Sequence, residues 1–261
     1  MNQSRSIKRD LQLIRLIVSR NLTVRYKRSV IGAGWTLINP MMSSFVLWLV
    51  FSNSFGQRLS PGQQYAPYLM TGTLLNVFIS AGIVLSAQSI LDHATILTKI
   101  YVKPQIFTLS SSLSSLVNFG IGLIPLIFVC FLSGDAVSIK FPLVLIIAFC
   151  LVITVAGAGL FLSIFFIRYN DTQGVTTLLL SMLSFLTPLF YPITDLTPRM
   201  QNLVSLNPLT SYLNCFRWTV SDYANVEWWD WIYMVGTSGF VFVMGVYFFK
   251  KQWNRVIVML A

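Results

Sequence analysis

The chain contains six long stretches without a single Asp, Glu, Lys or Arg. They cover residues 36–55, 66–91, 106–132, 141–167, 174–191 and 231–249. A helix needs about 20 apolar residues to cross the roughly 30 Å hydrocarbon core of a bilayer, and each stretch is long enough or nearly so. Charged residues make up only 10% of the chain, far below the roughly 25% of soluble domains. The sequence therefore predicts an all-α integral membrane protein with six transmembrane helices, which form a single transmembrane domain over residues 1–261.

The Lys and Arg residues are distributed unevenly between the two sides that six spans create. Fourteen of the eighteen fall on the side that holds both termini, and eight of these lie within residues 1–35. The other side holds Arg58, Lys140, Arg199 and Arg217. Because Lys and Arg are enriched on the cytoplasmic side of membrane proteins, we expect both termini in the cytoplasm, with a cytoplasmic tail at 250–261. This topology accounts for the net charge of +10 and requires no nucleic-acid partner.

A basic cluster precedes the first span, in the segment NLTVRYKRSVIGAGW at residues 21–35. A secretory signal would also begin with basic residues, but its apolar core is short and ends at a small-residue cleavage site. Here the apolar run continues at full spanning length, so we expect no signal peptide. The three cysteines, Cys130, Cys150 and Cys215, fall in two spans and a later loop without paired or metal-type spacing. We expect them to be packing residues.

An amphipathic segment lies before the first span. Its apolar residues follow helical spacing: Ile7, Leu11, Ile14, Val18 and Leu22. Polar residues repeat the same spacing one position further along. We expect a cytoplasmic interface helix within residues 1–34, with its apolar face in the membrane and its cations toward lipid phosphates. A soluble arm that docks on a partner is the alternative.

Two connections differ from ordinary loops. The connection 92–105 mixes apolar and basic residues, with Asp92 as a candidate helix N-cap and Pro104 before the next span. It predicts one or two helical turns that protrude into the cytoplasm. The segment 188–230 is too apolar for an exposed loop and yet carries charges. Two short helices split at Asn207-Pro208 and dipping into the membrane from outside satisfy both facts, whereas a helical cap on the outer surface is the alternative.

The chain lacks the residues that several function classes need. Catalysis in a membrane needs carboxylates, histidines or a nucleophile set near water, but the only histidine, His93, and the only glutamate, Glu227, are predicted on opposite sides. Ion-coupled carriers usually keep ionisable groups inside their spans, and the six spans have none, although ion sites made of backbone carbonyls are still compatible with the sequence. We therefore expect neither an enzyme nor a metal site.

No lysine follows a glycine, so the phosphate-binding loop G-x-x-x-x-G-K-[ST] is absent. If ATP drives this protein, the ATPase is a separate polypeptide, ATP and magnesium bind to that partner, and this chain binds no cofactor itself. The connection 92–105 and the amphipathic N-terminal segment are then the natural docking surfaces for it.

The spans are rich in aromatic and small hydroxyl side chains. The candidate channel aromatics are Trp35, Trp48, Phe51, Phe55 and Phe78. Ring faces and hydroxyls suit a sugar polymer that slides past them. The alternative is that the rings contact lipid or neighbouring helices, and that the serines let helices pack closely.

Two segments carry recognisable patterns. RNLTVRYKRSVIGAGWTLINPM, at 20–41, has a basic R-Y-K-x-S-x-(I/L)-G motif that leads to a Trp and an Asn-Pro, and TPLFYPITDLTPRMQNLVSLNPLTSYLNCFR, at 187–217, has an F-Y-P turn, an N-P-L-T and a closing Arg. In order, spacing and layout, the chain resembles the permease subunits of bacterial ABC polysaccharide exporters of the type-2 group. The resemblance covers nearly the whole chain.

The resemblance implies a multi-pass protein of the bacterial cytoplasmic (inner) membrane. It implies a homodimer with two copies of a nucleotide-binding ATPase, exporting a glycan linked to undecaprenyl pyrophosphate or another lipid, such as O-antigen, teichoic acid or capsule. It assigns the site where the lipid pyrophosphate enters to Arg25, Tyr26, Lys27 and Arg28. It assigns ATPase coupling to Asp92, His93, Thr95, Lys99 and Lys103. It assigns the re-entrant outer gate to Tyr191, Pro192, Asn207, Pro208, Tyr212 and Arg217.

The sequence thus favours a channel-forming permease for a lipid-linked polysaccharide. Two alternatives are an ion-coupled carrier of small solutes and an ABC permease for a small lipid or drug. Drug-efflux relatives usually carry a large external domain, for which the short outer connections leave no room.

Overall fold

The computed structural model describes residues 2–26, 32, 34–56, 59, 63–99 and 102–257, and the side chains of these residues except 2–7 and 25–26. Every regular element within them is helical. The elements are α1 (Asn2–Tyr26), α2 (Gly34–Phe55), α3 (Tyr65–Asp92), α4 (Ala94–Leu97), α5 (Gln105–Leu132), η2 (Phe141–Leu143), α6 (Val144–Arg168), α7 (Thr172–Phe185), η3 (Ile193–Asp195), α8 (Pro198–Ser205), α9 (Pro208–Ser221) and α10 (Trp228–Val256). The predicted all-α class is confirmed for the described residues.

Five helical segments of the described chain are long and apolar enough to cross a membrane: α2, α3, α5, η2 with α6, and α10. They correspond to five of the six predicted spans. The remaining predicted span, 174–191, holds α7, which has 14 residues and is about 21 Å long at 1.5 Å per residue. Helix length therefore supports five spans, and the chain beyond α7 continues without helix through Tyr191.

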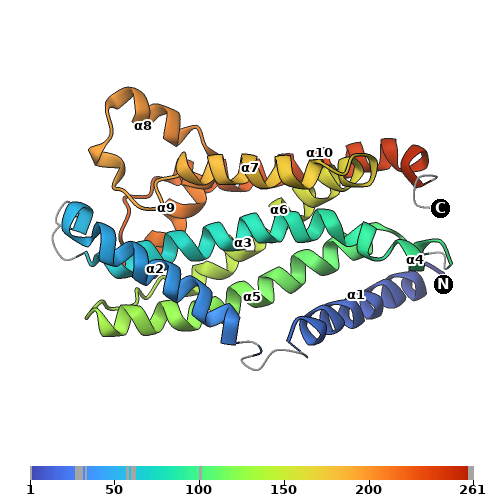
Figure 1. Ribbon diagram of the computed structural model, residues 1–261, viewed down its shortest axis with the longest axis horizontal. Coiled ribbons are helices and arrows are strands. Elements are labelled where there is room, and N and C mark those ends of the chain that lie inside the picture. The colour runs from blue at the N-terminus through green and yellow to red at the C-terminus, as the bar shows by residue number, and fades with distance from the viewer. Residues whose placement is uncertain are drawn as a thin grey trace.

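The long helices run side by side along the long axis of the molecule (Figure 1). The N and C labels lie at the same end, near α1 and α4, which we call the terminal end. The short helices α8 and α9 lie at the opposite end, which we call the distal end.

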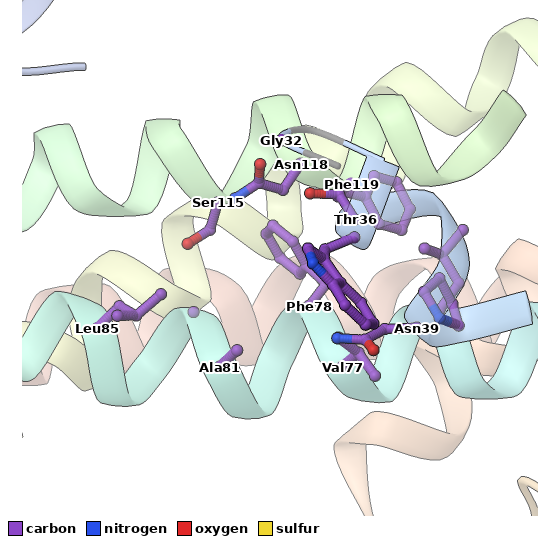
Figure 2. A pocket seen from close by; sticks show the side chains of 14 residues that line it. Gly32, Thr36, Asn39, Val77, Phe78, Ala81, Leu85, Ser115, Asn118 and Phe119 are labelled. Carbon is purple, nitrogen blue, oxygen red and sulfur yellow. The ribbon is translucent and has the colours of Figure 1, made fainter. Parts of the chain in front are cut away.

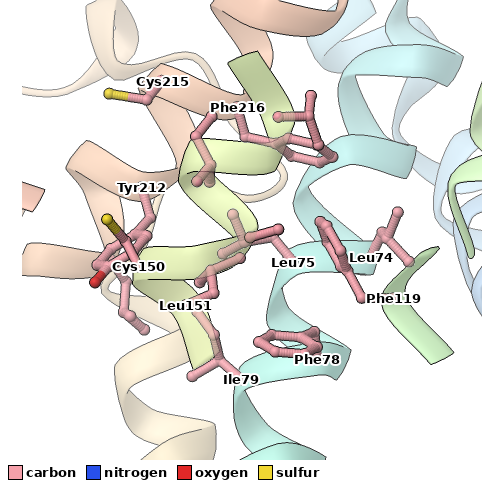
Figure 3. Packing of buried hydrophobic residues seen from close by; sticks show 14 of the residues in the cluster. Leu74, Leu75, Phe78, Ile79, Phe119, Cys150, Leu151, Tyr212, Cys215 and Phe216 are labelled. Atoms are coloured by element: carbon pink, nitrogen blue, oxygen red, sulfur yellow. The ribbon is translucent and has the colours of Figure 1, made fainter. Parts of the chain in front are cut away.

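Helix α3 lies at the centre and packs against α2, α5, α6, α7 and α9. Its Leu75, Phe78 and Ile79 are buried in the main apolar cluster, where Leu151 of α6 lies against them (Figure 3). Phe119 of α5 contacts Phe78 edge-on, with ring centroids 5.2 Å apart. Cys130, Cys150 and Cys215 are buried and free and belong to the same cluster, which confirms that they are packing residues.

Two local predictions need correction. Asp92 does not cap a helix N-terminus: it is the last residue of α3, and His93 precedes α4. Cys215 does not lie in a loop, because α9 includes it. The predicted one or two helical turns of the connection 92–105 are confirmed as one turn, the four-residue helix α4.

Helices α6 and α10 pack with their backbones in direct contact. A Cβ atom on Gly245 of α10 would lie 2.1 Å from the carbonyl oxygen of Gly157 of α6, and one on Gly157 would lie 2.5 Å from the Cα of Phe242. Small residues permit such close approach between membrane helices, where packing rather than the hydrophobic effect holds them together.

We predict that Gly245→Ala destabilises the protein by about 1–3 kcal/mol, since the added methyl group must push the two backbones apart. Thermal unfolding of the purified protein in detergent measures the effect. Gly239→Ala on the same helix is the matched control, because nothing lies within 4 Å of its added Cβ. Equal melting temperatures for the two variants would contradict the prediction.

Candidate functional site

A cavity of about 330 Å³ lies between α2, α3 and α5 at the middle of the molecule (Figure 2). Apolar and aromatic side chains form most of its wall, including Trp35 of α2 and Phe78 of α3. Four uncharged polar side chains also line it: Thr36 and Asn39 from α2, and Ser115 and Asn118 from α5. A largely apolar wall with a few convergent polar groups is typical of a ligand site.

A second cavity, of about 380 Å³, adjoins the first toward the terminal end. Leu85, Ser115 and Asn118 line both cavities, so the two form one groove between α1 and α2 on one side and α3 and α5 on the other. We call it the α1–α5 groove. Its terminal half is lined by Arg20, Asp92 and His93, whereas its middle half is lined by aromatic and aliphatic side chains. The groove is therefore amphipathic along its length.

His93 is held rigidly at the terminal half of this groove. Its Nδ1 lies 2.8 Å from the carbonyl oxygen of Ser89, and its ring stacks on Phe107 with centroids 4.7 Å apart. His93 is buried, so it is a packing residue of the connection as well as part of the groove wall.

The predicted access cluster falls largely outside what the structure describes. Arg25 and Tyr26 lie in the last turn of α1, but their side chains are not among those described, and Lys27 and Arg28 lie outside the described residues. Arg20, on the same helix and lining the groove, was not predicted. One sequence signal could have identified Arg20: it is a basic residue near the carboxyl end of the amphipathic helix, five residues before Arg25.

The charge pattern also does not identify Asn39 and Asn118, because it registers only Asp, Glu, Lys and Arg inside the spans. Carboxamides inside apolar helices are themselves informative, since in lipid they usually seek partners across helices. Asn76 follows that rule: its Oδ1 accepts a hydrogen bond from Ser184 Oγ of α7 at 2.6 Å.

The predicted coupling residues differ in their exposure to solvent and in whether they form an ion pair. Asp92, Thr95 and Lys99 are exposed on and around α4. Lys103 forms an ion pair with Asp10 of α1, with Nζ and Oδ2 2.6 Å apart. The interface helix and the connection 92–105 are thus joined directly, and a cavity of about 300 Å³ lies between them.

The predicted channel aromatics do not form one surface in this chain. Trp35 and Trp48 of α2 are exposed, Phe51 and Phe55 are half-buried, and Phe78 is buried in the core. The serines of α5 are buried, and Ser110, Ser112 and Ser114 each donate a hydrogen bond to a carbonyl one turn earlier. These serines therefore favour the helix-packing alternative. Phe78 packs in the core and also lines the groove together with Trp35.

Two short helices, α8 and α9, form the predicted gate segment and are separated at Asn207-Pro208, as the sequence predicted. Asn207 caps α9, because its Oδ1 accepts a hydrogen bond from the backbone N–H of Leu209 at 3.0 Å. Its Nδ2 donates to Thr187 Oγ1 at 2.8 Å. Tyr212 anchors α9, with its hydroxyl 2.6 Å from Thr154 Oγ1 of α6 and 2.6 Å from Ser238 Oγ of α10.

Arg217 of α9 organises the turn that precedes the gate helices. The side chain is buried, and its Nη1 and Nη2 donate to the carbonyl oxygens of Pro188 and Leu189, each at 2.9 Å. Nη2 also donates to the carbonyl oxygen of Tyr68 at 3.2 Å, and Nε to Thr71 Oγ1 at 3.4 Å. The guanidinium lies over the Tyr68 ring, 3.5 Å from its centroid. Every acceptor in these four bonds is neutral, so the charge is held by dipoles and a ring face.

Two tyrosines of α3 hold the same turn through its backbone. Tyr65 donates to the carbonyl oxygen of Phe190 at 2.7 Å, and Tyr68 donates to that of Tyr191 at 2.8 Å. Tyr191 in turn donates from its hydroxyl to the carbonyl of Phe185 at 3.1 Å, and Pro192 is buried. We call Tyr65, Tyr68 and Arg217 with the turn 187–191 the carbonyl clamp.

We predict that Arg217→Lys destabilises the protein by about 2–4 kcal/mol. A lysine keeps the charge but lacks the planar fork, so carbonyls of the turn lose their donors. Thermal unfolding and limited proteolysis around residues 188–197 measure this loss. Arg199→Lys is the matched control, because Arg199 is exposed on α8. An Arg217→Lys protein as stable and protease-resistant as the control would contradict the role of the clamp.

For the pair Asp10–Lys103, we predict that each charge reversal alone lowers the free energy of unfolding and that the double swap recovers part of the loss. The expected coupling is about 0.2–1 kcal/mol, because the Lys103 side chain is 57% exposed and exposed pairs contribute little. A double-mutant cycle with Asp10→Lys and Lys103→Asp measures it. Strict additivity of the two single changes would show that the pair contributes nothing.

The sequence profile of the ABC-2 type transporter family matches residues 12–221 of the chain. The O-antigen export system permease protein RfbA of Myxococcus xanthus is 26% identical over 209 residues, which cover 77% of each chain. A protein of the same name from Klebsiella pneumoniae is 23% identical over 238 residues, 90% of this chain and 85% of the relative. The inner membrane transport permease YadH of Escherichia coli K12 is 25% identical over 230 residues, 85% of this chain and 87% of the relative.

The matched residues include the α1–α5 groove, the connection 92–105 and the gate helices. The five apolar spans agree with a multi-pass transport subunit. The chain belongs to the ABC-2 type transporter family.

Proposed function

We propose that the chain is the channel-forming permease of an ATP-driven exporter that moves a lipid-linked polysaccharide across the bacterial inner membrane. The proposed glycan is of the O-antigen, teichoic acid or capsule type. The names of the relatives from Myxococcus xanthus and Klebsiella pneumoniae, which are O-antigen export system permeases, support the substrate class. The observation that carries the proposal is the amphipathic α1–α5 groove.

The groove suits a lipid-linked pyrophosphate because its two halves differ in chemistry. Arg20 at the terminal half supplies a cationic donor for a phosphate, since guanidinium pairs with phosphate through strong, charge-assisted hydrogen bonds. The aromatic and aliphatic wall around Phe78 suits an apolar chain, and Asn39 and Asn118 offer hydrogen bonds to the first sugars. In this proposal Arg25, Tyr26, Lys27 and Arg28 attract the pyrophosphate from the membrane surface, and Arg20 receives it.

The terminal end is proposed to face the cytoplasm, since most Lys and Arg residues lie in the segments at that end. Helix α7 with the following turn then makes the sixth crossing, and α8 and α9 are the re-entrant gate on the outer side. The carbonyl clamp supports this arrangement, because irregular backbone inside a membrane needs internal hydrogen-bond partners. The alternative for α8 and α9 remains a cap on the outer surface.

A homodimer with two copies of a separate ATPase completes the proposed machine. ATP and magnesium would bind to the ATPase subunits, and this chain would bind neither of them. Helix α4, with its exposed Thr95 and the nearby exposed Lys99, offers the docking surface, and the Asp10–Lys103 ion pair links that surface to α1. The exposed rings of Trp35 and Trp48 on α2 would then face the glycan path or lipid, depending on how the two copies meet.

The test is deletion of the gene in its bacterial host, followed by complementation and measurement of surface glycan by immunoblot. We expect deletion to abolish surface glycan and to leave glycan in the cytoplasm. We expect Arg20→Glu to restore at most about a tenth of the wild-type level, since loss of one charge-assisted phosphate contact costs at least about 1.4 kcal/mol.

Arg15→Glu is the matched control: it makes the same change of charge on α1, and Arg15 is exposed and does not line the groove. Its export should stay near wild type at equal protein level. Normal surface glycan in the deletion strain would overturn the proposed function. Equal losses for Arg15→Glu and Arg20→Glu would overturn the role of Arg20 and assign the effect to surface charge alone.

A further inference from the structure

A separate cavity of about 230 Å³ lies at the distal end beside the carbonyl clamp, since Tyr68, Pro188 and Arg217 line it. It is lined by residues of the segment 188–194, by helix α9, by Leu59 and Gln63 before α3, and by residues 223–225 after α9. It is smaller than the roughly 300–1,000 Å³ pockets that take drug-sized ligands, so it suits one small unit rather than a chain. We call it the distal cavity.

Three carboxamides line the distal cavity: Gln63 before α3, Asn214 on α9, and Asn225 after α9. Within the described part of the chain, none of these three side chains makes a hydrogen bond to protein. Each carries two N–H donors and one carbonyl acceptor. The cavity therefore presents both donors and acceptors, with no fixed preference for an anion or a cation.

Arg217 forms a buried polar part of the same wall. Its guanidinium donates to the carbonyl oxygens of Pro188, Leu189 and Tyr68 and to Thr71 Oγ1, all of them neutral acceptors. Arg217 is 3% exposed, so this part of the wall carries a buried positive charge and favours a ligand oxygen.

Apolar surface completes the wall. Tyr68 and Tyr223 are both buried and line the cavity, together with Pro192. The Tyr223 hydroxyl accepts a hydrogen bond from the backbone N–H of Gln64 at 3.0 Å, which fixes the ring. Carboxamides around the edge and rings on the wall match a pyranose, whose hydroxyls both donate and accept and whose C–H face is apolar.

We propose that the distal cavity binds one sugar unit of the glycan as it leaves the protein. This inference rests on the proposed function and adds to it a sugar site at the exit, distinct from the α1–α5 groove. Because Asn214 belongs to α9 and Ile193 and Thr194 belong to the segment before α8, a sugar bound there would contact both sides of the gate segment. The site would keep the emerging chain from sliding back between transport steps.

The binding test uses the purified protein in lipid nanodiscs and a panel of neutral methyl glycosides of common hexoses, followed by saturation-transfer NMR. We expect at least one glycoside to bind wild type and to lose about fivefold or more of its signal with Asn214→Leu, which removes a polar partner. Asn53→Leu is the matched control, since Asn53 is exposed on α2 and does not line the cavity. If Asn214→Leu does not fold, Gln63→Leu tests the same cavity.

Absence of binding by every glycoside, or binding that neither Asn214→Leu nor Gln63→Leu reduces, would overturn the distal sugar site. In cells, surface glycan should fall with Asn214→Leu and not with Asn53→Leu. Wild-type export by a folded Asn214→Leu protein would overturn the site and leave the proposed function intact. Failure of the proposed function would show itself separately, as normal surface glycan after deletion of the gene.

Discussion

The turn between α7 and α8 presents its backbone carbonyls to the protein interior, and the rest of the distal end depends on how they are satisfied. Arg217 and two tyrosines of α3 donate to the carbonyls of residues 188–191. Unpaired carbonyls in a buried or lipid environment cost about 1–3 kcal/mol each, so the turn cannot move without exchanging these partners. The clamp thereby sets where α8 and α9 lie, and it also forms one wall of the distal cavity.

The overall fold was largely predictable because uncharged stretches of spanning length leave few alternatives. The split of the gate segment at Asn207-Pro208 was also predictable, since Asn favours an N-cap and Pro the first turn of a helix. The sixth span could not be predicted in the same way. Residues 174–191 are uncharged throughout, but Pro188 within this run lies in a turn held by tertiary hydrogen bonds, which hydropathy does not register.

The candidate site was less predictable, for physical reasons that differ by residue. Charge counting found the basic cluster at 25–28 but could not identify Arg20, whose position in the groove depends on how α1 packs beside α5. Phe78 was expected in a channel, and it both lines the groove and packs against Phe119, because aromatic content alone does not say which face of a helix meets its neighbours. Asn118 was overlooked although a carboxamide in an apolar helix is itself a signal.

Helix α3 connects the two cavities that carry the functional proposals. Its first turns hold Tyr68 in the carbonyl clamp, its middle lines the α1–α5 groove with Phe78, and its last residue, Asp92, lies beside His93 at the terminal half of that groove. A packed helix moves as a unit, so a tilt that widened the groove would also displace the partners of the turn 187–191. By linkage, a ligand that favours the wider groove must then alter the stability of the clamp, and the clamp must alter the affinity of the groove by the same factor. Helix α3 alone is therefore sufficient to couple substrate binding in the α1–α5 groove to the position of the gate helices α8 and α9.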